Sequence, residues 1–553
     1  MTGQHLQYQT IDVDLVSPIL DSTDELTSLL SDTPKKESRW SKLRKNRTFT
    51  LLPSVFIGTA IWFGVTPTEE LTVTAVHLLA VFTSCIFALI TTSVDISMLV
   101  LTGLTLLAIT HSFECVDHAT GLMTECRLCG QENPLTDELY ECKGGKESFK
   151  QSLEGFSSSV VWLIFAAFHL GKAVEITQLG RRLSLLMIKT FGKHTLGLAY
   201  AIVFSELLLA PFVPSNTARG GGIVLPVVHS IATTLGSTPD HNPEIGSFLI
   251  LVGSHANLLS ASMYLTGMAA NPIVVAKANQ LFPDIDFGFM TWLQGSIVPA
   301  LVCAACIPLI IRWSLSLNTD KPQRGKHVRG GDNVIQHAQM ELSKMGPVSL
   351  KEWQLCFVLL SCLAMWVTSS MTQLDSTLVA LIGIVALLHM GTITWKDVSG
   401  NTNAWDTLFW LGGFVTIAHQ LSEAGASSYL GHKISFAIQH FKLPPVPALA
   451  ISYFLTTFMF SSLSAHTVAF VGTFLDAGHA LGAHPMMLTA FISYFGALGG
   501  CMTNFSTGSA AMYYAPGYVE RARWFKLGFQ MAVFYLTIYF TVGVSWWSFL
   551  GWL

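Results

Sequence analysis

The sequence predicts an all-α polytopic membrane protein with about eleven transmembrane helices and two re-entrant hairpins, arranged in two inverted repeats. Three observations lead to this fold class. The 553 residues are 51% hydrophobic and only 12% charged, about half the charged share of a typical soluble domain. Long stretches lack Asp, Glu, Lys and Arg, and two apolar tracts carry polar breaks at their centres. Three short motifs of the first half recur in the same order in the second half.

The composition also excludes several classes of protein. So few charged residues cannot cover the several soluble domains that a chain of 553 residues would otherwise form. The apolar content excludes a disordered chain, and a formal net charge of −4 argues against a nucleic-acid binder. Ten cysteines in this length are too few for a disulfide scaffold. We therefore expect the lipid bilayer as a partner and no nucleic acid.

Eleven spans are defined by stretches free of charged side chains, since a membrane-spanning helix needs roughly 20 apolar residues. They cover approximately residues 48–66, 71–94, 96–111, 156–171, 247–276, 287–311, 353–374, 376–395, 404–422, 480–519 and 527–553. Two further tracts, 197–236 and 443–480, are interrupted by polar residues. Irregular backbone at membrane depth is tolerated where it is buried in protein or lines a cavity, so we interpret both tracts as re-entrant hairpins.

Basic residues near the span ends predict a multi-pass protein with a cytoplasmic N-terminus. Seven Lys and Arg residues fall within 35–47, directly before the first span, and those of 181–193, 312–329 and 521–526 fall on the same side. The chain then divides into a cytoplasmic tail 1–47 (acidic, then basic), three spans in 48–111, an exoplasmic loop 112–155, a first inverted repeat 156–311, a cytoplasmic linker 312–352 and a second inverted repeat 353–553.

The N-terminal tail bears on the location of the protein. Its first 34 residues contain six acidic residues and no Lys or Arg, which opposes a plastid or mitochondrial transit peptide. Residues 25–30, Glu-Leu-Thr-Ser-Leu-Leu, have the form of an acidic dileucine sorting signal, although a plain acidic tail explains them equally well. We expect the plasma membrane or an endomembrane.

Three motif pairs define the two repeats. Each repeat contains a span, a hairpin with a polar tip and a span interrupted at Thr-Gly, and an odd number of crossings per unit makes the copies inverted. Paired interrupted helices at matching positions indicate the midplane site of a transporter, whereas chance similarity among small-residue runs is the alternative. The pairs are 162–163 with 410–411, 214–218 with 461–465, and 266–270 with 507–511.

Residues 214–226, Pro-Ser-Asn-Thr-Ala-Arg-Gly-Gly-Gly-Ile-Val-Leu-Pro, resemble the signature of the divalent anion:sodium symporter family. The branch of 2-oxoglutarate/malate translocators and citrate or tartrate exchangers is the most similar. Residues 265–272, 464–467 and 517–519 fit the same branch, and the resemblance runs from about residue 50 to the C-terminus. It implies eleven spans, two hairpins, a homodimer, and elevator-like movement of a transport domain against a dimeric scaffold.

The hairpin tips and interrupted spans are the expected binding site for small dicarboxylate anions. Removing water from a dianion in the membrane is costly unless other donors replace it, and broken helices supply N–H groups and positive helix dipoles. Three glycines at 220–222 would allow the backbone to approach the anion. The candidate substrate-binding residues are Ser215, Asn216, Thr217, Arg219, Thr266, Ser462, Ser464, His466 and Thr507.

Each candidate also has a purely structural explanation. The hydroxyl and amide side chains could satisfy the backbone of the broken hairpins, and the threonines could serve helix packing. Arg219 could be the buried partner of Glu206, and His466 could bond to a backbone carbonyl.

The second hairpin bears on coupling, because it has Ser462-Leu463-Ser464 where the sodium-coupled relatives have a second Ser-Asn-Thr. We expect a secondary active transporter of di- or tricarboxylates (the malate, 2-oxoglutarate, succinate or citrate class) working by sodium-independent exchange. Arg219 would be a fixed cation that the anion neutralises, and His466 would add a pH dependence. A sodium-coupled dicarboxylate or sulfate symporter of the same fold is the alternative, and an intramembrane hydrolase using Ser462 or Ser464 with His466 is a remote one. We expect no enzymatic activity, cofactor or metal site.

The 112–155 loop contains Cys115, Cys126, Cys129 and Cys142. Four cysteines outside the cytosol predict two disulfides with three possible connectivities. The Cys-x-x-Cys spacing at 126–129 would also suit zinc, which is the alternative.

Overall fold

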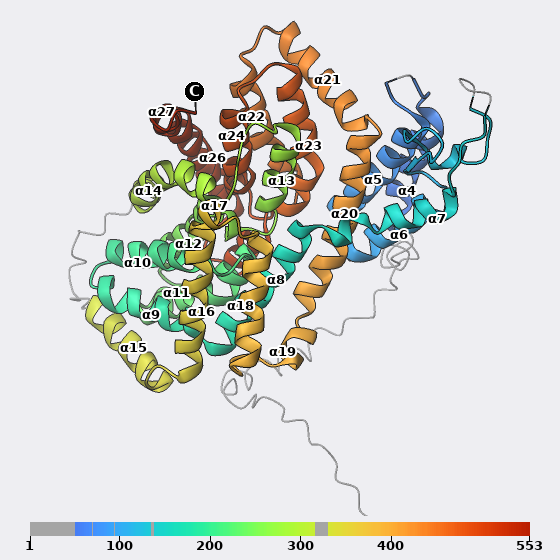
Figure 1. The fold of residues 1–553 in the computed structure, drawn as a ribbon. Coiled ribbons are helices and arrows are strands. Elements are labelled where there is room, and N and C mark those ends of the chain that lie inside the picture. Colours follow the sequence, from blue (N-terminus) through green and yellow to red (C-terminus); the bar gives the residue numbers. More distant parts are fainter. Residues whose placement is uncertain (1–49, 69, 93, 134–137, 316–329, 553) are drawn as a thin grey trace, which may run out of the picture. The chain divides into compact units, whose positions relative to one another are not determined.

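The computed structural model describes residues 50–68, 70–92, 94–133, 138–315 and 330–552 (Figure 1). The acidic tail with its dileucine pattern, the basic residues before the first span and part of the linker therefore lie outside the described residues. Within the described part, helices dominate, and the strands are one short antiparallel pair.

Three apolar helices precede the repeats, and a small loop domain follows them. The helices are α4 (Leu52–Gly64), α5 (Val73–Thr91) and α6 (Ile96–Ile109). The loop contains β1 (Glu114–Val116), β2 (Met123–Glu125), a 3₁₀ turn (Cys126–Leu128), α7 (Gly144–Ser152) and a second 3₁₀ turn (Glu154–Ser157).

The first repeat contains a re-entrant hairpin and an interrupted helix. It consists of α8 (Ser159–Thr177), α9 (Leu179–Phe191), the hairpin arms α10 (Thr195–Leu209) and α11 (Leu225–Thr234) with a π-helical segment (Thr217–Val224) before α11, α12 (Pro243–Met263), a 3₁₀ turn (Leu265–Gly267), α13 (Asn271–Leu281) and α14 (Phe289–Ser314).

The second repeat follows α15 (Gly330–Met345) and has the same order of elements. It consists of α16 (Leu350–Val367), α17 (Ser369–Thr372), α18 (Ser376–His389), α19 (Trp395–Ser399), α20 (Thr402–Glu423), α21 (Ala426–His440), the hairpin arms α22 (Pro445–Thr456) and α23 (Leu463–Ala480), α24 (Pro485–Leu498), α25 (Gly508–Tyr514), α26 (Arg521–Ile538) and α27 (Val544–Phe549). Short 3₁₀ or π-helical segments lie at Thr457–Met459, Gly499–Met502 and Tyr539–Gly543.

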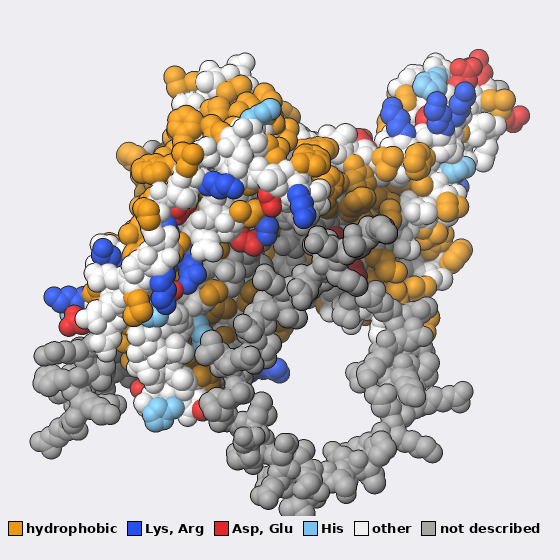
Figure 2. All heavy atoms as spheres, turned by 90° about the horizontal axis from the view of Figure 1, so that it is seen from below, with side chains coloured by type: hydrophobic (Ala, Val, Ile, Leu, Met, Phe, Trp, Pro, Cys, Tyr) orange, Lys and Arg blue, Asp and Glu red, His pale blue; other side chains and the backbone are white. Residues whose placement is uncertain are grey.

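The predicted fold class is confirmed, since every one of the eleven predicted spans coincides with a helix or an interrupted helix. Seven described helices are long and apolar enough to cross a membrane, and five shorter apolar helices accompany them. Figure 2 shows hydrophobic side chains over much of one face, and large side chains such as Phe63 and Trp353 are 82% and 64% exposed. Apolar exposure on this scale suits lipid contact rather than water.

Several helices with charged residues were not expected from the sequence. In α9, α15 and α21 the polar side chains interrupt the charge-free stretches by which spans were recognised. α9 and α15 pack together, and Arg181 of α9 lies 2.8 Å from Glu341 of α15. Arg182 pairs with Glu352 at 2.5 Å, at the start of α16. Amphipathic helices of this kind require a 3.6-residue pattern to be recognised.

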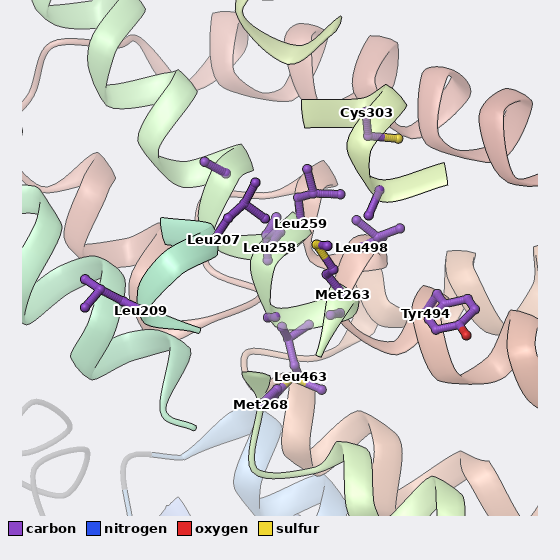
Figure 3. Packing of buried hydrophobic residues seen from close by; sticks show 14 of the residues in the cluster. Leu207, Leu209, Leu258, Leu259, Met263, Met268, Cys303, Leu463, Tyr494 and Leu498 are labelled. Carbon is purple, nitrogen blue, oxygen red and sulfur yellow. The ribbon is translucent and has the colours of Figure 1, made fainter. Parts of the chain in front are cut away.

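The core is centred on α12, of whose 21 residues 18 are buried. Leu258, Leu259 and Met263 pack against side chains of both hairpins, among them Leu207 and Leu463 (Figure 3). Because α12 touches α10, α14 and α24, it is the element that fixes the first hairpin relative to the second repeat.

Two disulfides hold the 112–155 loop. They join Cys115 to Cys126 and Cys129 to Cys142, which selects one of the three connectivities. The zinc alternative is wrong for this structure, because Cys126 and Cys129 are bonded to different partners. Both disulfides close short loops, and the strands and helix that the structure describes in this segment are themselves short.

The loop is anchored to α20 through polar contacts. The Glu114 N–H donates to Gln420 Oε1 at 3.2 Å, and Gln420 Nε2 donates to Glu154 Oε2 at 3.1 Å. Glu114 is buried and lies directly opposite Glu125 in the β1–β2 pair. Burial, with smaller contributions from the charges of Glu125 and Glu423, raises the pKa of Glu114 from 4.5 to about 7.

This raised pKa gives the loop a stability that depends on pH. The folded loop keeps the Glu114 proton to a higher pH than the unfolded loop does, so its stability should fall as pH rises from about 4.5 to about 7. We expect hydrogen–deuterium exchange of β1 and β2 amides, corrected for intrinsic rates, to show decreasing protection across this interval. Glu114→Gln should flatten the profile, whereas Glu132→Gln, at an exposed site of the same loop, should not. An unchanged profile in Glu114→Gln would contradict the assignment.

Candidate functional site

The tips of the two hairpins meet at a small cavity of about 130 Å³. Six of the nine predicted site residues line it: Ser215, Asn216, Thr217, Ser462, Ser464 and Thr507. Its lining contains no charged side chain, and the rest of the wall consists of Phe168, Pro214, Ala269, Trp410, Leu463 and Gly508.

Local sequence explains both tips. Pro214 follows α10, and proline disfavours helical geometry in the residue before it, here Val213, so the chain leaves the helix there. Ser215 Oγ then accepts the Ala218 N–H at 3.1 Å. Ser462 has the same role as the N-cap of α23, where its Oγ accepts the Ala465 N–H at 3.3 Å. Each tip therefore presents the N-terminal end of a helical arm to the cavity.

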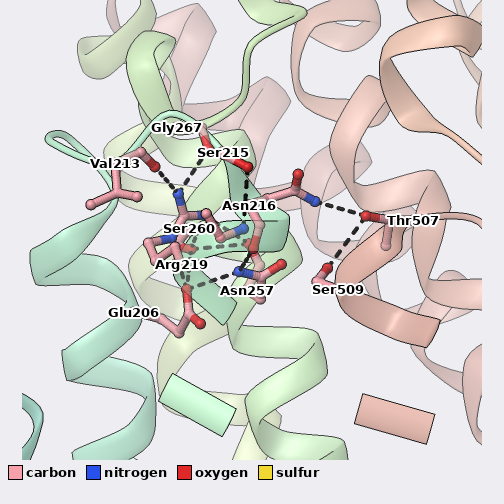
Figure 4. Close-up of polar contacts among 11 residues, drawn as sticks. Glu206, Val213, Ser215, Asn216, Arg219, Asn257, Ser260, Gly267, Thr507 and Ser509 are labelled. Carbon is pink, nitrogen blue, oxygen red and sulfur yellow. Dashed lines mark hydrogen bonds and ion pairs between the residues drawn. The ribbon is translucent and has the colours of Figure 1, made fainter. Parts of the chain in front are cut away.

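A direct hydrogen bond joins the two repeats at the cavity. Asn216 Nδ2 donates to Thr507 Oγ1 at 2.9 Å, and Thr507 Oγ1 lies 3.3 Å from Ser509 Oγ (Figure 4). The approach depends on glycine at 508, because a Cβ there would lie 2.7 Å from Thr217 Oγ1. The Thr-Gly interruption of the second repeat is thus the point at which the first hairpin can come close.

Arg219 lies outside the cavity, in a buried polar network (Figure 4). Its Nε donates to Glu206 Oε2 at 2.9 Å, and its Nη1 donates to the carbonyls of Val213 and Gly267 at 2.6 and 3.0 Å. Its Nη2 donates to Ser260 Oγ at 2.9 Å. The expectation of an uncompensated cation beside the anion is wrong, because Glu206 neutralises the guanidinium. The structural alternative, a buried partner for Glu206, is the one observed.

The same network fixes the first tip. Asn257 of α12 donates through Nδ2 to Glu206 Oε2 at 3.1 Å and to the Asn216 carbonyl at 2.9 Å. Gly220 and Gly221 make room for this packing, because a Cβ at Gly220 would lie 2.6 Å from Asn257 Nδ2, and a Cβ at Gly221 would collide with Met512. These two glycines therefore serve helix packing rather than approach to an anion.

His466 and Thr266 also lie away from the cavity. His466 is fully buried, its Nε2 is 2.9 Å from Thr456 Oγ1, and its ring packs against Tyr453 and Phe460. Thr266 Oγ1 donates to the Pro211 carbonyl at 2.8 Å. Both side chains stabilise a hairpin tip through contacts made outside the cavity. The hydrolase alternative loses its basis, since the hydroxyl that His466 meets is that of Thr456 rather than Ser462 or Ser464.

Sequence reasoning missed the aromatic wall of the cavity. Phe168 comes from α8 and Trp410 from α20. Trp410 was recognised only as a repeat marker, and Phe168 carries no signal in an apolar span. A second cavity of about 280 Å³ shares Phe168, Pro214 and Ser215 with the first and extends to Lys172 and Asn401.

The fold and the cavity define a membrane transporter built from two inverted repeats. Residues 45–553 match the transmembrane region of the sodium:sulfate symporters, and the chain belongs to this family. It is 30% identical over 508 residues to the chloroplastic dicarboxylate transporter 1 of Arabidopsis thaliana, covering 91% of this chain and 83% of that protein. It is also 30% identical over 406 residues to the L-tartrate/succinate antiporter of Escherichia coli K12, covering 72% of this chain and 81% of that protein.

A solved structure supports the fold. The YdaH transporter of Alcanivorax borkumensis superposes with a TM-score of 0.50 at 13% identity, covering 83% of this chain and 99% of that one. At this identity the similarity concerns the arrangement of helices alone.

The buried pair predicts how Arg219 variants behave. Arg219→Met leaves the Glu206 charge buried without its partner, which costs about 3–5 kcal/mol, so we expect a strongly lowered melting temperature and little monodisperse protein. Replacing both charges, in Glu206→Leu with Arg219→Met, should recover most of the melting temperature. Arg521→Met, at an exposed arginine, is the control. A stable Arg219→Met protein that has lost transport would instead place Arg219 in anion binding.

Proposed function

We propose that the chain is a secondary active transporter that exchanges di- or tricarboxylates of the malate, 2-oxoglutarate, succinate or citrate class without sodium. The observation that carries the proposal is the small cavity, rich in neutral hydrogen-bond donors, at which the hairpin tips of both repeats meet. The names of the relatives support the substrate class, since one is a dicarboxylate transporter and another a tartrate/succinate antiporter.

In this proposal the anion is held by neutral groups. Ser215, Asn216 and Thr217 donate from the first tip, Ser462 and Ser464 from the second, and Thr507 from the interrupted helix. The N-terminal ends of the helical arms add a partial positive charge of about 0.5 each, which suits a carboxylate at each tip. The cavity of about 130 Å³ lies below the roughly 300–1,000 Å³ of drug-sized sites and therefore favours a compact anion.

Exchange follows from the same donors. An empty cavity would carry hydroxyls, an amide and helix ends through the membrane with only part of their hydrogen bonds made, by contacts such as Asn216 with Thr507, and with little water, and unsatisfied polar groups are costly in a low-dielectric medium. A bound dicarboxylate satisfies them, so the loaded carrier moves more readily than the empty one. This argument replaces the uncompensated Arg219 as the origin of obligatory exchange.

Sodium-coupled symport is the second candidate. Asn257 Oδ1 and Asn504 Oδ1 are buried and have no hydrogen-bond partner among the described residues. Amide oxygens are suitable ligands for hard cations, and Asn257 also touches the Asn216 carbonyl. A cation bound next to the first tip would add charge that the dianion could neutralise.

We further propose a homodimer in the plasma membrane or an endomembrane, with an elevator-like movement. The two hairpins with α12, α13, α24 and α25 would form the moving part, and α8 and α20 would belong to the scaffold. The basic residues near the span ends support a cytoplasmic N-terminus and an exoplasmic 112–155 loop.

Purified protein in liposomes tests exchange. We expect rapid uptake of labelled malate into liposomes loaded with malate, little uptake into empty ones, and no change when choline replaces sodium. Asn216→Ala should weaken malate binding roughly tenfold or more, because a lost donor to a charged partner costs on the order of 1.5–3 kcal/mol. Gln131→Ala, which removes an exposed amide from the 112–155 loop, is the matched control.

Two results would overturn parts of this proposal. A requirement for sodium would select the symport candidate, and equal uptake into empty and loaded liposomes would exclude obligatory exchange. Normal malate affinity in Asn216→Ala would remove the hairpin tip from the binding site.

Cysteine labelling tests the orientation. In intact right-side-out vesicles, an impermeant maleimide should modify Cys115, Cys126, Cys129 and Cys142 only after reduction, because all four are in disulfides. Variants in which one disulfide is replaced by two serines identify the labelled pair. Labelling that requires permeabilised vesicles would invert the proposed topology.

A further inference from the structure

A large cleft lies beside the second hairpin, among helices of both repeats and α5. Its volume is about 560 Å³, and α5, α13, α20, α21, α23 and the start of α8 contribute to its lining. Its walls are mainly apolar and include Leu79, Phe82, Ile273, Leu430, Ile434 and Val468. It shares no lining residue with the cavity at the hairpin tips.

The charges of this cleft have one sign. The ionisable residues that line it are Lys277, His419 and Lys433, all basic, with no Asp or Glu among them. Lys277 Nζ donates to Ser422 Oγ at 2.7 Å and lies 3.8 Å from Asp476, so its charge is partly compensated. His419 lies 3.3 Å from Glu154.

Lys433 is the cation whose charge no carboxylate among the described residues compensates. Its Nζ lies 5.0 Å from the centre of the Tyr429 ring, and it forms no ion pair within the described part of the chain. The side chain is exposed, on the surface of α21. An apolar cleft of this size with an uncompensated lysine at its edge matches an amphiphile with an anionic head group.

We propose that this cleft, which we call the lysine cleft, binds an anionic phospholipid of the surrounding bilayer. An acyl chain occupies the apolar walls contributed by α5, α21 and α23, and the phosphate pairs with Lys433 and reaches toward Lys277. An exposed ion pair between a lysine and a phosphate is worth up to about 1 kcal/mol, which corresponds to about a fivefold preference over a zwitterionic lipid.

The chemistry of the cleft argues against two other occupants. A free dicarboxylate would leave the apolar walls hydrated, whereas an acyl chain covers them. A neutral amphiphile would fill the walls but would leave the Lys433 charge without a partner. An anionic phospholipid satisfies both features.

Lipid retention provides the test. Purified protein is reconstituted in nanodiscs of equal parts phosphatidylglycerol and phosphatidylcholine, extracted in mild detergent, and analysed by native mass spectrometry. We expect the wild type to retain phosphatidylglycerol about fivefold over phosphatidylcholine. Lys433→Gln should abolish this preference. Lys442→Gln, which removes a lysine from the connection after α21, should retain it.

A second variant tests the effect of the cleft's volume on lipid retention separately from the effect of its charge. Ala418→Phe adds volume to the cleft wall and leaves both lysines in the sequence, and it should reduce retention of both lipids. Equal retention of the two lipids by the wild type, or unchanged preference in Lys433→Gln, would overturn the proposal. Displacement of phosphatidylglycerol by millimolar malate in the wild type and in Lys442→Gln would make the cleft part of the substrate route, and would also overturn it. These readouts do not depend on transport, so they stand apart from the proposed exchange.

Discussion

The buried ion pair between Arg219 and Glu206 is the constraint on which the first hairpin tip depends. An ion pair inside a protein is costly unless further hydrogen bonds compensate the lost water, and here Ser260 and Asn257 bond to Glu206 while backbone carbonyls accept from Arg219. Asn257 also bonds to the Asn216 carbonyl. The ion pair therefore fixes the carbonyl group of Asn216 through Asn257. Asn216 is also the residue whose side chain bonds to Thr507 of the second repeat.

This use of charge has a consequence for the cavity. The arginine adjacent to the Ser-Asn-Thr motif maintains structure, and the cavity contains neutral donors alone. Neutral donors bind a carboxylate less strongly than a guanidinium does, and a carrier must also release its substrate on the far side. A preorganised set of moderate donors suits this double requirement better than a fixed cation at the centre.

Much of the fold could be predicted because the membrane imposes simple rules. The spans could be recognised as stretches without charged residues. The hairpin tips, at 214–217 and 460–462, could be recognised by proline and small polar residues. The amphipathic helices α9, α15 and α21 escaped this criterion, since they carry charges on one face. Their contacts, such as Arg182 with Glu352, join segments far apart in the chain, and a single sequence contains no direct record of such pairs.

At the site, the sequence predicted correctly which segments reach the cavity, but not in which direction the side chains of Arg219 and His466 point. Arg219 follows Thr217 by two residues, and His466 follows Ser464 by two, in helical segments. Residues two apart on an α-helix point about 200° apart, and two apart on a π-helix also lie on roughly opposite faces, so when Thr217 and Ser464 line the cavity, Arg219 and His466 face away from it. Geometry could therefore have excluded both as anion ligands. Phe168 and Trp410 could not be found this way, because an aromatic residue in an apolar span usually faces lipid or core.

The cavity wall also indicates where the proposed movement divides the protein. Asn216 and Thr507 are hydrogen-bonded to each other, so the first hairpin tip and the interrupted helix of the second repeat would move together as one body around the anion. Phe168 of α8 and Trp410 of α20 close the same cavity from elements outside the hairpins. In an elevator movement the two aromatic side chains would stay behind, and they contact the site through apolar surface that can slide without breaking hydrogen bonds. At the cavity, the polar bonds would thus lie within the moving part and the boundary would be apolar, whereas the bond from Lys277 of α13 to Ser422 of α20 crosses the boundary and would have to break.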